Sequence, residues 1–482
     1  MKMQRILFTG IIVIMLLILE SCATNPVTGK KELMLLSKSQ EIAMGKQSDP
    51  EIVNFFGLYD DPEMQKFIQE RGEEMVKVSH RDELDYEFKI VDSPVINAFA
   101  VPGGYVYFTR GIMAHFNNEA EFAGVLGHEI GHITARHSAK QYSNSMIAQV
   151  GLAAGMVISP EFAQFADIAQ QGIGLLFLQF SRNHERQSDK LGVEYSSKIG
   201  YDANKMAGFF QTLDNLRQTS GGEATPTFLS THPDPQDREQ RVIKLAEKWK
   251  EKLPESDFKV ERNDYLKMID GMVYGEDPKQ GFVQRGSFFH PVLKFRFPIP
   301  QQWTIQNTPQ QLQMAEKDGN ALMILRLAQG SALDEAGRAV LEQNQLELIE
   351  SKELNVNGLP AIAMLADQKQ QVGKIRTLTY LIKYDGNIYN LMGISRAESF
   401  NRYSDIFLKS MRNFSELKDP EMLNVEAERI IIREAPENGT LSSVLKALDV
   451  DQSRLGELAM LNGMNLDDRV EQGTLIKTIG ME

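Results

Sequence analysis

The stretch that decides both fold and chemistry is residues 125–137, VLGHEIGHITARH, which holds three of the eight histidines in this chain of 482 residues. His128 and His132 are four residues apart, so on an α-helix they lie about 40° apart around the axis and one turn apart along it. The apolar residues of the segment fall on the opposite face. The spacing predicts a helix with a packed back and two imidazoles that can reach one metal ion.

Glu129 completes an H-E-x-x-H pattern, which is typical of zinc hydrolases. A hydrolytic zinc ion takes three protein ligands and leaves a fourth position open, so two histidines are one ligand short. Glu129 is better placed as the general base that takes a proton from the water attacking a peptide carbonyl. The alternative is a pair of surface histidines on an ordinary helix.

The best source of a third ligand is residues 181–189, SRNHERQSD. Glu185 and Asp189 are four residues apart on a predicted helix. One carboxylate can bind the metal while the other hydrogen-bonds the far nitrogen of a ligating histidine. His184 is the rival ligand, but on a helix it points about 100° away from Glu185. We predict Glu185 as the ligand and Asp189 as the supporting group, with His184, or no third ligand here, as alternatives.

Length and composition bound the class of protein. Single hydrophobic cores stop growing near about 250–300 residues, so a chain of 482 predicts several domains. With 42% hydrophobic and 24% charged residues, the chain is neither generally disordered nor a polytopic membrane protein. A net charge of -13 argues against a nucleic-acid partner, which needs clustered Lys and Arg.

The N-terminus predicts export. Residues 1–21 resemble a lipoprotein signal peptide, with two basic residues before an apolar run at 6–19 that is shorter than the usual span of about 20. Cys22, the single cysteine, follows at once and resembles the lipidated first residue of a bacterial lipoprotein. Ala23 after it favours the outer membrane by the same resemblance. The alternative is a free thiol beside an uncleaved anchor.

We predict an α+β chain whose first domain, residues 22–262, is mainly helical. Its predicted elements are helices at 37–78, strands at 86–109 with a hairpin turn at 102–104, and helices at 118–143 and 147–216. The apolar segment 151–180 is either a buried helical hairpin or a surface that contacts lipid or a hydrophobic client.

Two further units follow. Residues 283–417 predict an α+β accessory domain that weakly resembles PsbP-like folds, with strands at 288–298, 321–327, 361–365, 375–383 and 388–394 and a helix at 400–411. Residues 425–482 resemble a LysM-like βααβ module, with strands at 429–433 and 475–478 and helices at 440–448 and 454–462. Such modules bind N-acetylglucosamine-containing glycans such as peptidoglycan. The alternative is a protein-binding or spacing domain.

Several separated motifs, in this order, resemble the M48 family of zinc metallopeptidases: NAFAVPGGY at 97–105, HEIGH at 128–132, Glu185 and Asp189 within SRxxExxxD, and THP at 231–233 followed by Arg238. The resemblance covers residues 22–250. It implies a gluzincin-like zincin domain with a small β-hairpin or sheet beside the cleft, and one Zn2+ ion per chain. Because several long apolar spans are lacking, the chain resembles the exported branch of the family.

The same resemblance implies roles near the metal. His232 would gate the site as a switchable fourth ligand or stabilise the tetrahedral intermediate; alternatively, it caps the following helix. Arg238 would stabilise the oxyanion or pair with a helix carboxylate. His137 is expected to be a solvated or hydrogen-bonded histidine, and the alternative is contact with the edge of the cleft. Residues 97–105 either bind the substrate backbone as an added strand or form only an internal hairpin.

Together these features predict an exported, lipid-anchored zinc metalloendopeptidase that cleaves misfolded or stalled cell-envelope proteins. Glu129, Asp189 and His232 are its predicted catalytic groups. The expected partners are unfolded envelope polypeptides, the membrane through Cys22 and peptidoglycan through residues 425–482. The alternatives are a chaperone-like assembly factor with little proteolysis and an envelope scaffold that works through its C-terminal units.

Overall fold

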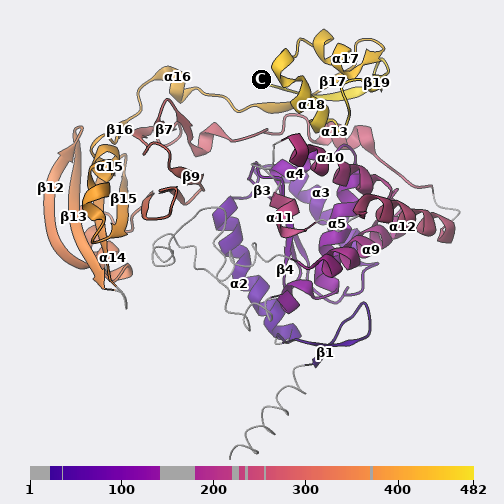
Figure 1. The fold of residues 1–482 in the computed structure, drawn as a ribbon, viewed down its shortest axis with the longest axis horizontal. Coiled ribbons are helices and arrows are strands. Elements are labelled where there is room, and N and C mark those ends of the chain that lie inside the picture. Colours follow the sequence, from indigo (N-terminus) through magenta and orange to yellow (C-terminus); the bar gives the residue numbers. More distant parts are fainter. Residues whose placement is uncertain are drawn as a thin grey trace, which may run out of the picture.

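The computed structural model describes residues 22–34, 36–141, 180–219, 227–233, 237–253, 257–369 and 373–481. Within these ranges the chain is a mixed α+β structure, as predicted, and its elements form three units (Figure 1). The predicted signal peptide, residues 1–21, and all but the last residue of the apolar segment 151–180 lie outside the described ranges. No helix inside those ranges combines the length and apolar character needed to cross a membrane.

The first unit is mainly helical. Its helices are α2 (Lys38–Phe56), α3 (Pro62–Val76), α4 (Arg110–His115), α5 (Glu119–Thr134), α9 (Arg182–Lys198), α10 (Lys205–Thr219), α11 (Thr227–Thr231), α12 (Arg238–Lys252) and α13 (Arg262–Met268). A short strand pair, β1 (Cys22–Thr24) and β2 (Lys31–Leu33), precedes them. The stretch predicted as helical at 37–78 forms two helices, because Gly57 adopts a φ of 76° and ends the first.

A three-stranded sheet lies beside these helices. Its strands, in the order β3-β5-β4, are β3 (Glu87–Val91), β4 (Ala98–Val101) and β5 (Tyr105–Thr109). The antiparallel pairing of β4 with β5 confirms the predicted hairpin, and β3 runs parallel to β5. Gly103 in the turn has a φ of 94°, and a Cβ on it would lie 2.7 Å from the Glu41 carbonyl oxygen, so only glycine fits there.

The helix that carries HEIGH is shorter than predicted. The pattern indicated one helix from 118 to about 143, but α5 ends at Thr134 and a separate helical turn occupies residues 137–141. Arg136 stands at the break with a φ of 59°. Its guanidinium donates to the Glu41 carboxylate at 2.5 Å, and both side chains are buried, so this pairing holds the break in place.

The second unit is built on a seven-stranded antiparallel sheet in the order β12-β13-β14-β15-β11-β10-β9. The strands are β9 (Thr304–Asn307), β10 (Gln311–Ala315), β11 (Ala321–Leu327), β12 (Glu347–Val356), β13 (Leu359–Lys369), β14 (Lys374–Tyr384) and β15 (Asn387–Arg396). Separate apolar cores lie on its two faces, under α14 (Leu333–Gln343) and α15 (Phe400–Arg412). A smaller sheet contains β6 (Phe282–Gln284), β7 (Ser287–His290), β8 (Phe295–Pro298) and β16 (Ser415–Glu416).

The structure confirms the predicted strands that became β11, β13, β14 and β15 and the predicted helix that became α15. The single strand predicted at 288–298 is instead two strands, β7 and β8, joined by a turn. Strands β9, β10 and β12 and helix α14 were not predicted. The resemblance of this unit to PsbP-like folds stays a prediction.

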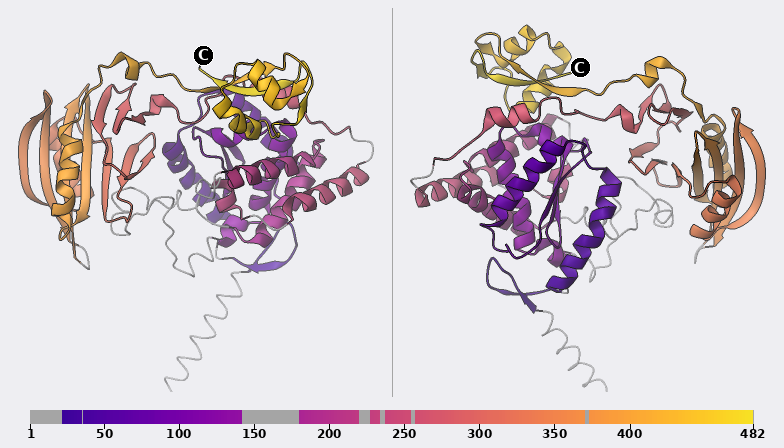
Figure 2. Two further views of the ribbon diagram at one scale, coloured as in Figure 1. Left: turned by 45° about the horizontal axis from the view of Figure 1, so that its top comes forward. Right: turned by 180° about the vertical axis from the view of Figure 1, so that it is seen from behind.

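The third unit follows the short helix α16 (Pro420–Leu423). It contains β17 (Arg429–Glu434), β18 (Gly439–Thr440), α17 (Leu441–Ala447), α18 (Leu455–Leu461), β19 (Arg469–Val470) and β20 (Leu475–Gly480). The strand-helix-helix-strand order is as predicted, and β17 pairs with β20. The LysM assignment and glycan binding stay predictions. Both views in Figure 2 place this unit against the helical unit.

Lys477 on β20 attaches the third unit to the first. Its side chain is 0% exposed, and its ammonium donates to the carbonyl oxygens of Ala114 and Phe116, each at 3.0 Å. Ala114 lies in the last turn of α4, and Phe116 directly follows that helix. Asn462 holds the Lys477 backbone through bonds of 2.9 Å to its N–H and 2.8 Å to its carbonyl. A buried cation therefore fixes the C-terminal unit just ahead of the helix that carries HEIGH.

Candidate metal centre

Two crossing helices bring the candidate ligands together. α5 carries the HEIGH motif, and α9 carries Glu185 and Asp189 one turn apart. A Cβ on Gly127 would lie 3.0 Å from the Gly192 backbone, and a Cβ on Gly192 would lie 2.8 Å from the Gly124 carbonyl oxygen. Larger side chains would push the helices apart. These glycines therefore let the α9 carboxylates reach the α5 imidazoles.

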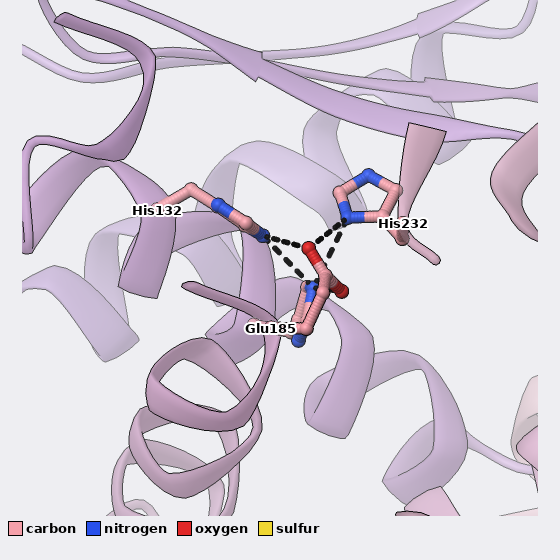
Figure 3. A group of neighbouring side chains, drawn as sticks. His132, Glu185 and His232 are labelled. Atoms are coloured by element: carbon pink, nitrogen blue, oxygen red, sulfur yellow. Dashed lines mark hydrogen bonds and ion pairs between the residues drawn. The ribbon is translucent and has the colours of Figure 1, made fainter. Parts of the chain in front are cut away.

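Four fully buried side chains, those of His128, His132, Glu185 and His232, turn donor atoms toward one point, as Figure 3 shows for the three that it labels. The Nε2 atoms of His128 and His132 are 3.0 Å apart, and Glu185 oxygens lie 3.4 Å and 3.5 Å from them. Nδ1 of His232 is 3.3 Å from Nε2 of His128 and 3.2 Å from Oε1 of Glu185.

These distances are close to those between the ligand atoms of a tetrahedrally coordinated zinc ion. Donors about 2.1 Å from a zinc ion in tetrahedral coordination lie about 3.4 Å from one another. Three of the four donors are the predicted ligands His128, His132 and Glu185. The fourth, His232, stands where a hydrolytic zinc site keeps its open position. The residues therefore fit a zinc ion with four protein donors.

Asp189 supports the predicted ligand His128. Its Oδ1 lies 3.0 Å from Nδ1 of His128, so the ring keeps its proton on Nδ1 and turns the lone pair of Nε2 toward the other donors. Arg238 donates to the same carboxylate oxygen at 2.7 Å, and Arg241 donates to the other at 3.0 Å. Of the two roles open for Arg238, this geometry shows pairing with a carboxylate.

Burial and the two carboxylates set the protonation of the cluster. Burial lowers the pKa of His132 well below its ordinary value, so its ring is neutral, as ligation requires. Burial acts the same way at His128, but hydrogen bonds to Asp189 and Glu185 outweigh it and raise the pKa to about 9, so a metal ion that binds Nε2 displaces a proton from it. Although burial opposes it, His232 and His128 hold the pKa of Glu185 well below its ordinary value. The carboxylates thus create a field that favours a cation.

Glu129 lies beside the cluster without belonging to it. Its side chain is 0% exposed, and neither carboxylate oxygen has a hydrogen-bond partner among the described residues. Oε1 is 3.7 Å from Nε2 of His232. Burial raises the pKa of Glu129, as a general base near neutral pH requires. A buried carboxylate without partners costs free energy, so this placement fits a catalytic base better than a structural residue.

His137 has a role that the sequence interpretation missed. Its Nδ1 is 3.1 Å from Nδ1 of His132, and its Nε2 is 3.1 Å from Oε1 of Gln187. Because Nε2 of His132 faces the other donors, Nδ1 of His132 carries the proton and donates to His137, which donates in turn to Gln187. An unbroken helix would turn His137 about 140° away from His132. The break at Arg136 brings the rings together.

His184, the rival third ligand, is not one of the four donors. Its ring stacks on that of His137 with centroids 4.3 Å apart. The structure therefore favours Glu185 over His184.

Replacing His137 with Phe keeps a ring of similar shape but removes the acceptor for His132. We expect the affinity for zinc to fall about 10–100-fold, the usual cost of losing an outer partner of a ligating histidine. A competition titration with a chromophoric chelator measures this. His184→Phe changes a ring that stacks on His137 without contacting the donors, so it is the matched control. Equal zinc affinity in wild type and His137→Phe would contradict a supporting role for the hydrogen bonds from His132 to His137 and from His137 to Gln187.

Two imidazoles one helical turn apart, a carboxylate from a second helix and a buried glutamate without a hydrogen-bond partner in the described part of the chain define a metallopeptidase centre. Comparison with known proteins gives the same class. Residues 62–246 match Peptidase family M48. The chain therefore carries a peptidase domain of family M48, which confirms the resemblance and implies a metal at this centre.

Two relatives each match less than half of the chain. A putative β-barrel assembly-enhancing protease of Vibrio cholerae is 31% identical over 212 residues, which cover 42% of this chain and 43% of the relative. The mitochondrial metalloendopeptidase OMA1 of Arabidopsis thaliana is 30% identical over 177 residues, covering 36% and 35%. The matched region spans less than half of each relative.

Among solved structures, the cyanobacterial PsbP of Synechocystis covers 27% of this chain and 91% of its own, with 11% identity and a TM-score of 0.24. A score this low does not establish a shared fold.

Proposed function

We propose that this chain is an exported, lipid-anchored zinc metalloendopeptidase that hydrolyses peptide bonds in misfolded or stalled cell-envelope proteins. One observation carries the proposal: four buried donors lie within 4.8 Å of one another beside Glu129, a buried carboxylate without a hydrogen-bond partner among the described residues. The name of the Vibrio cholerae relative refers to β-barrel assembly, and β-barrels of this kind span outer membranes. That name supports substrates in the envelope.

The residues divide the chemistry among them. A bound zinc ion supplies a Lewis acid and lowers the pKa of water toward about 7. Glu129 takes the proton of the attacking water and passes it to the nitrogen of the leaving amine. Asp189, neutralised by Arg238 and Arg241, keeps the His128 ring turned toward the metal position.

The sheet offers a place for the substrate backbone. In the order β3-β5-β4, strand β4 lies at an edge, and it packs against α5. An extended peptide can add to such an edge through main-chain hydrogen bonds, which explains affinity with little side-chain preference. This use of residues 98–101 is part of the proposal.

His232 is proposed as a gate. With His232 as a fourth donor, the site has no open position, and an enzyme in that state is latent. Removal of His232 leaves His128, His132 and Glu185, the three ligands of an open site. Substrate binding that displaces the ring would have the same effect.

The test uses wild type and His232→Ala, because a closed fourth position can hide activity in the wild type. We expect zinc-loaded protein to cut reduced, carboxymethylated α-lactalbumin into fragments seen by mass spectrometry, with His232→Ala at least as active as wild type. Chelation should stop cleavage and added zinc should restore it. If neither zinc-loaded protein yields fragments, the proposed activity is wrong.

A further inference from the structure

The second unit contains a cavity of about 810 Å³ that the metal centre does not use. Its wall is formed by the β9–β10 hairpin, the ends of β11 and β15, one side of α14 and the small sheet. The volume lies within the range of ligand sites, about 300–1,000 Å³. It is large enough to accept a ligand, and its chemistry indicates which kind.

The lining mixes apolar and amide groups. Eight of its 23 residues are Asn or Gln, and none is Asp or Glu, although the whole chain has 65 acidic against 52 basic residues. Lys279 and Arg326 are the cations of the lining. Burial lowers the pKa of His290 to about 4, so that ring is neutral near pH 7. The cavity is therefore neutral to positive, and it complements a neutral or acidic ligand.

The side chain of Asn390 indicates that a ligand in the cavity donates a hydrogen bond. The residue is 1% exposed and lines the cavity, and its side-chain oxygen Oδ1 has no hydrogen-bond partner among the described residues. A buried acceptor left unpaired costs about 1–3 kcal/mol, so a ligand that donates a hydrogen bond there recovers that cost. Nearby, Leu327 on the rim is 50% exposed, which offers an apolar contact.

Two ligand classes fit an apolar wall of this size: an acyl chain and a polypeptide. An acyl chain would leave the buried Asn390 acceptor without a partner, and a buried unpaired polar group is costly. A peptide group can donate its N–H to that acceptor, and it offers the same donor and acceptor as the carboxamides of the lining. The cavity also reaches Asn307, the last residue of the edge strand β9, and an extended chain can pair with an edge strand.

We propose that this cavity binds an extended, neutral or acidic segment of an unfolded polypeptide that also carries an apolar side chain. The proposal rests on the proposed function, because it makes the cavity a second holding site for the same substrates.

The cavity lies where the second unit meets the first. Gln280 in its wall donates to Asp92 at 2.6 Å, and Asp92 directly follows β3 of the peptidase sheet. Arg110 binds the same carboxylate at 2.8 Å. In Figure 1, β9 lies between the large sheet and α2 of the helical unit. A chain held in the cavity thus starts beside the sheet whose edge strand β4 packs against α5, the helix that carries HEIGH.

The test compares two exposed leucines on different strands of the sheet, Leu327 at the end of β11 and Leu348 on β12. Leu327→Glu places an acid at the acid-free rim, whereas Leu348→Glu changes a leucine of similar exposure, 48%, on the far edge strand β12. Full-length Glu129→Gln protein, which holds substrate without cutting it, is titrated against fluorescently labelled β-casein, an acidic unfolded protein. We expect Leu327→Glu to raise Kd about tenfold, in the range of a single important contact, and Leu348→Glu to leave it unchanged.

A second measurement separates this site from the metal centre. Leu327→Glu is also made in protein that is otherwise wild type, and kcat/KM is measured for casein and for a six-residue peptide. We expect the casein value to fall relative to the peptide value. Equal casein binding by all proteins, or equal weakening by both substitutions, would overturn the proposal. Displacement of casein by micromolar palmitate would overturn it in favour of an acyl ligand. Casein binding without any cleavage by zinc-loaded wild type or His232→Ala would leave the cavity assignment intact and refute the proposed activity instead.

Discussion

Glu129→Gln is expected to lower kcat for peptide hydrolysis by at least about 10²–10⁴-fold, the contribution of a positioned general base. The substitution keeps the shape of the side chain, and Glu129 is not among the four donors, so zinc content should equal that of wild type. The free energy of unfolding should not fall, because a buried carboxylate without a hydrogen-bond partner among the described residues is lost. Stopped assays on a fluorogenic peptide, metal analysis and urea unfolding measure the three quantities.

The pattern of these three results separates the candidate functions. Lost activity with retained zinc and stability identifies Glu129 as the base. Lost zinc or lost stability would show a structural role and contradict the assignment. If cells that carry Glu129→Gln in place of wild type kept a normal envelope, the chaperone-like alternative would gain support over the protease.

Lys477→Ala is expected to lower the free energy of unfolding by roughly 3–5 kcal/mol, the range for removing one member of a buried charged network. The change removes the donor from the Ala114 and Phe116 carbonyls. It also removes a positive charge that stabilises the ionised form of Glu121, a buried residue in the first turn of α5. Burial lowers the pKa of Lys477 and raises that of Glu121, while the charge of each group opposes the shift of the other.

Thermal unfolding followed by circular dichroism, together with limited proteolysis, measures this effect. The matched control is Lys446→Ala, an exposed lysine on α17 of the same unit, where surface substitutions typically stay within about 0.5 kcal/mol. Early proteolytic release of the C-terminal unit in Lys477→Ala alone is the expected sign of undocking. An unchanged melting temperature would contradict a structural role for the buried lysine.

Residue spacing predicted the ligands because metal binding depends on local geometry. His128 and His132 share a helix face, as do Glu185 and Asp189, and each pair needs only the helical repeat. Glycines on a helix indicate close packing, but only the structure shows that Gly127 and Gly192 lie where α5 crosses α9. His137 was missed because its position depends on a left-handed residue, Arg136, held by Glu41 from about 95 residues earlier in the chain.

Long, mostly buried strands were predicted, whereas a long exposed strand and a helix with little buried surface were missed. The predicted strands β11, β14 and β15 have long buried runs. Strand β12 is exposed at nearly every position, so its ELIESKELNV sequence gives no alternating apolar signal. Helix α14 buries only three small or medium side chains, Ala336, Gly337 and Val340. The docking of Lys477 connects residues more than 360 apart, and no local pattern encodes such a contact.

The most direct test of the central claim is the zinc content of purified protein by mass spectrometry of the metal, for wild type, His128→Ala and the exposed-histidine control His80→Ala. If His128 is a zinc ligand, we expect one zinc ion per chain in wild type and His80→Ala and almost none in His128→Ala. Wild-type protein without tightly bound zinc, or His128→Ala protein with a full complement, would contradict it.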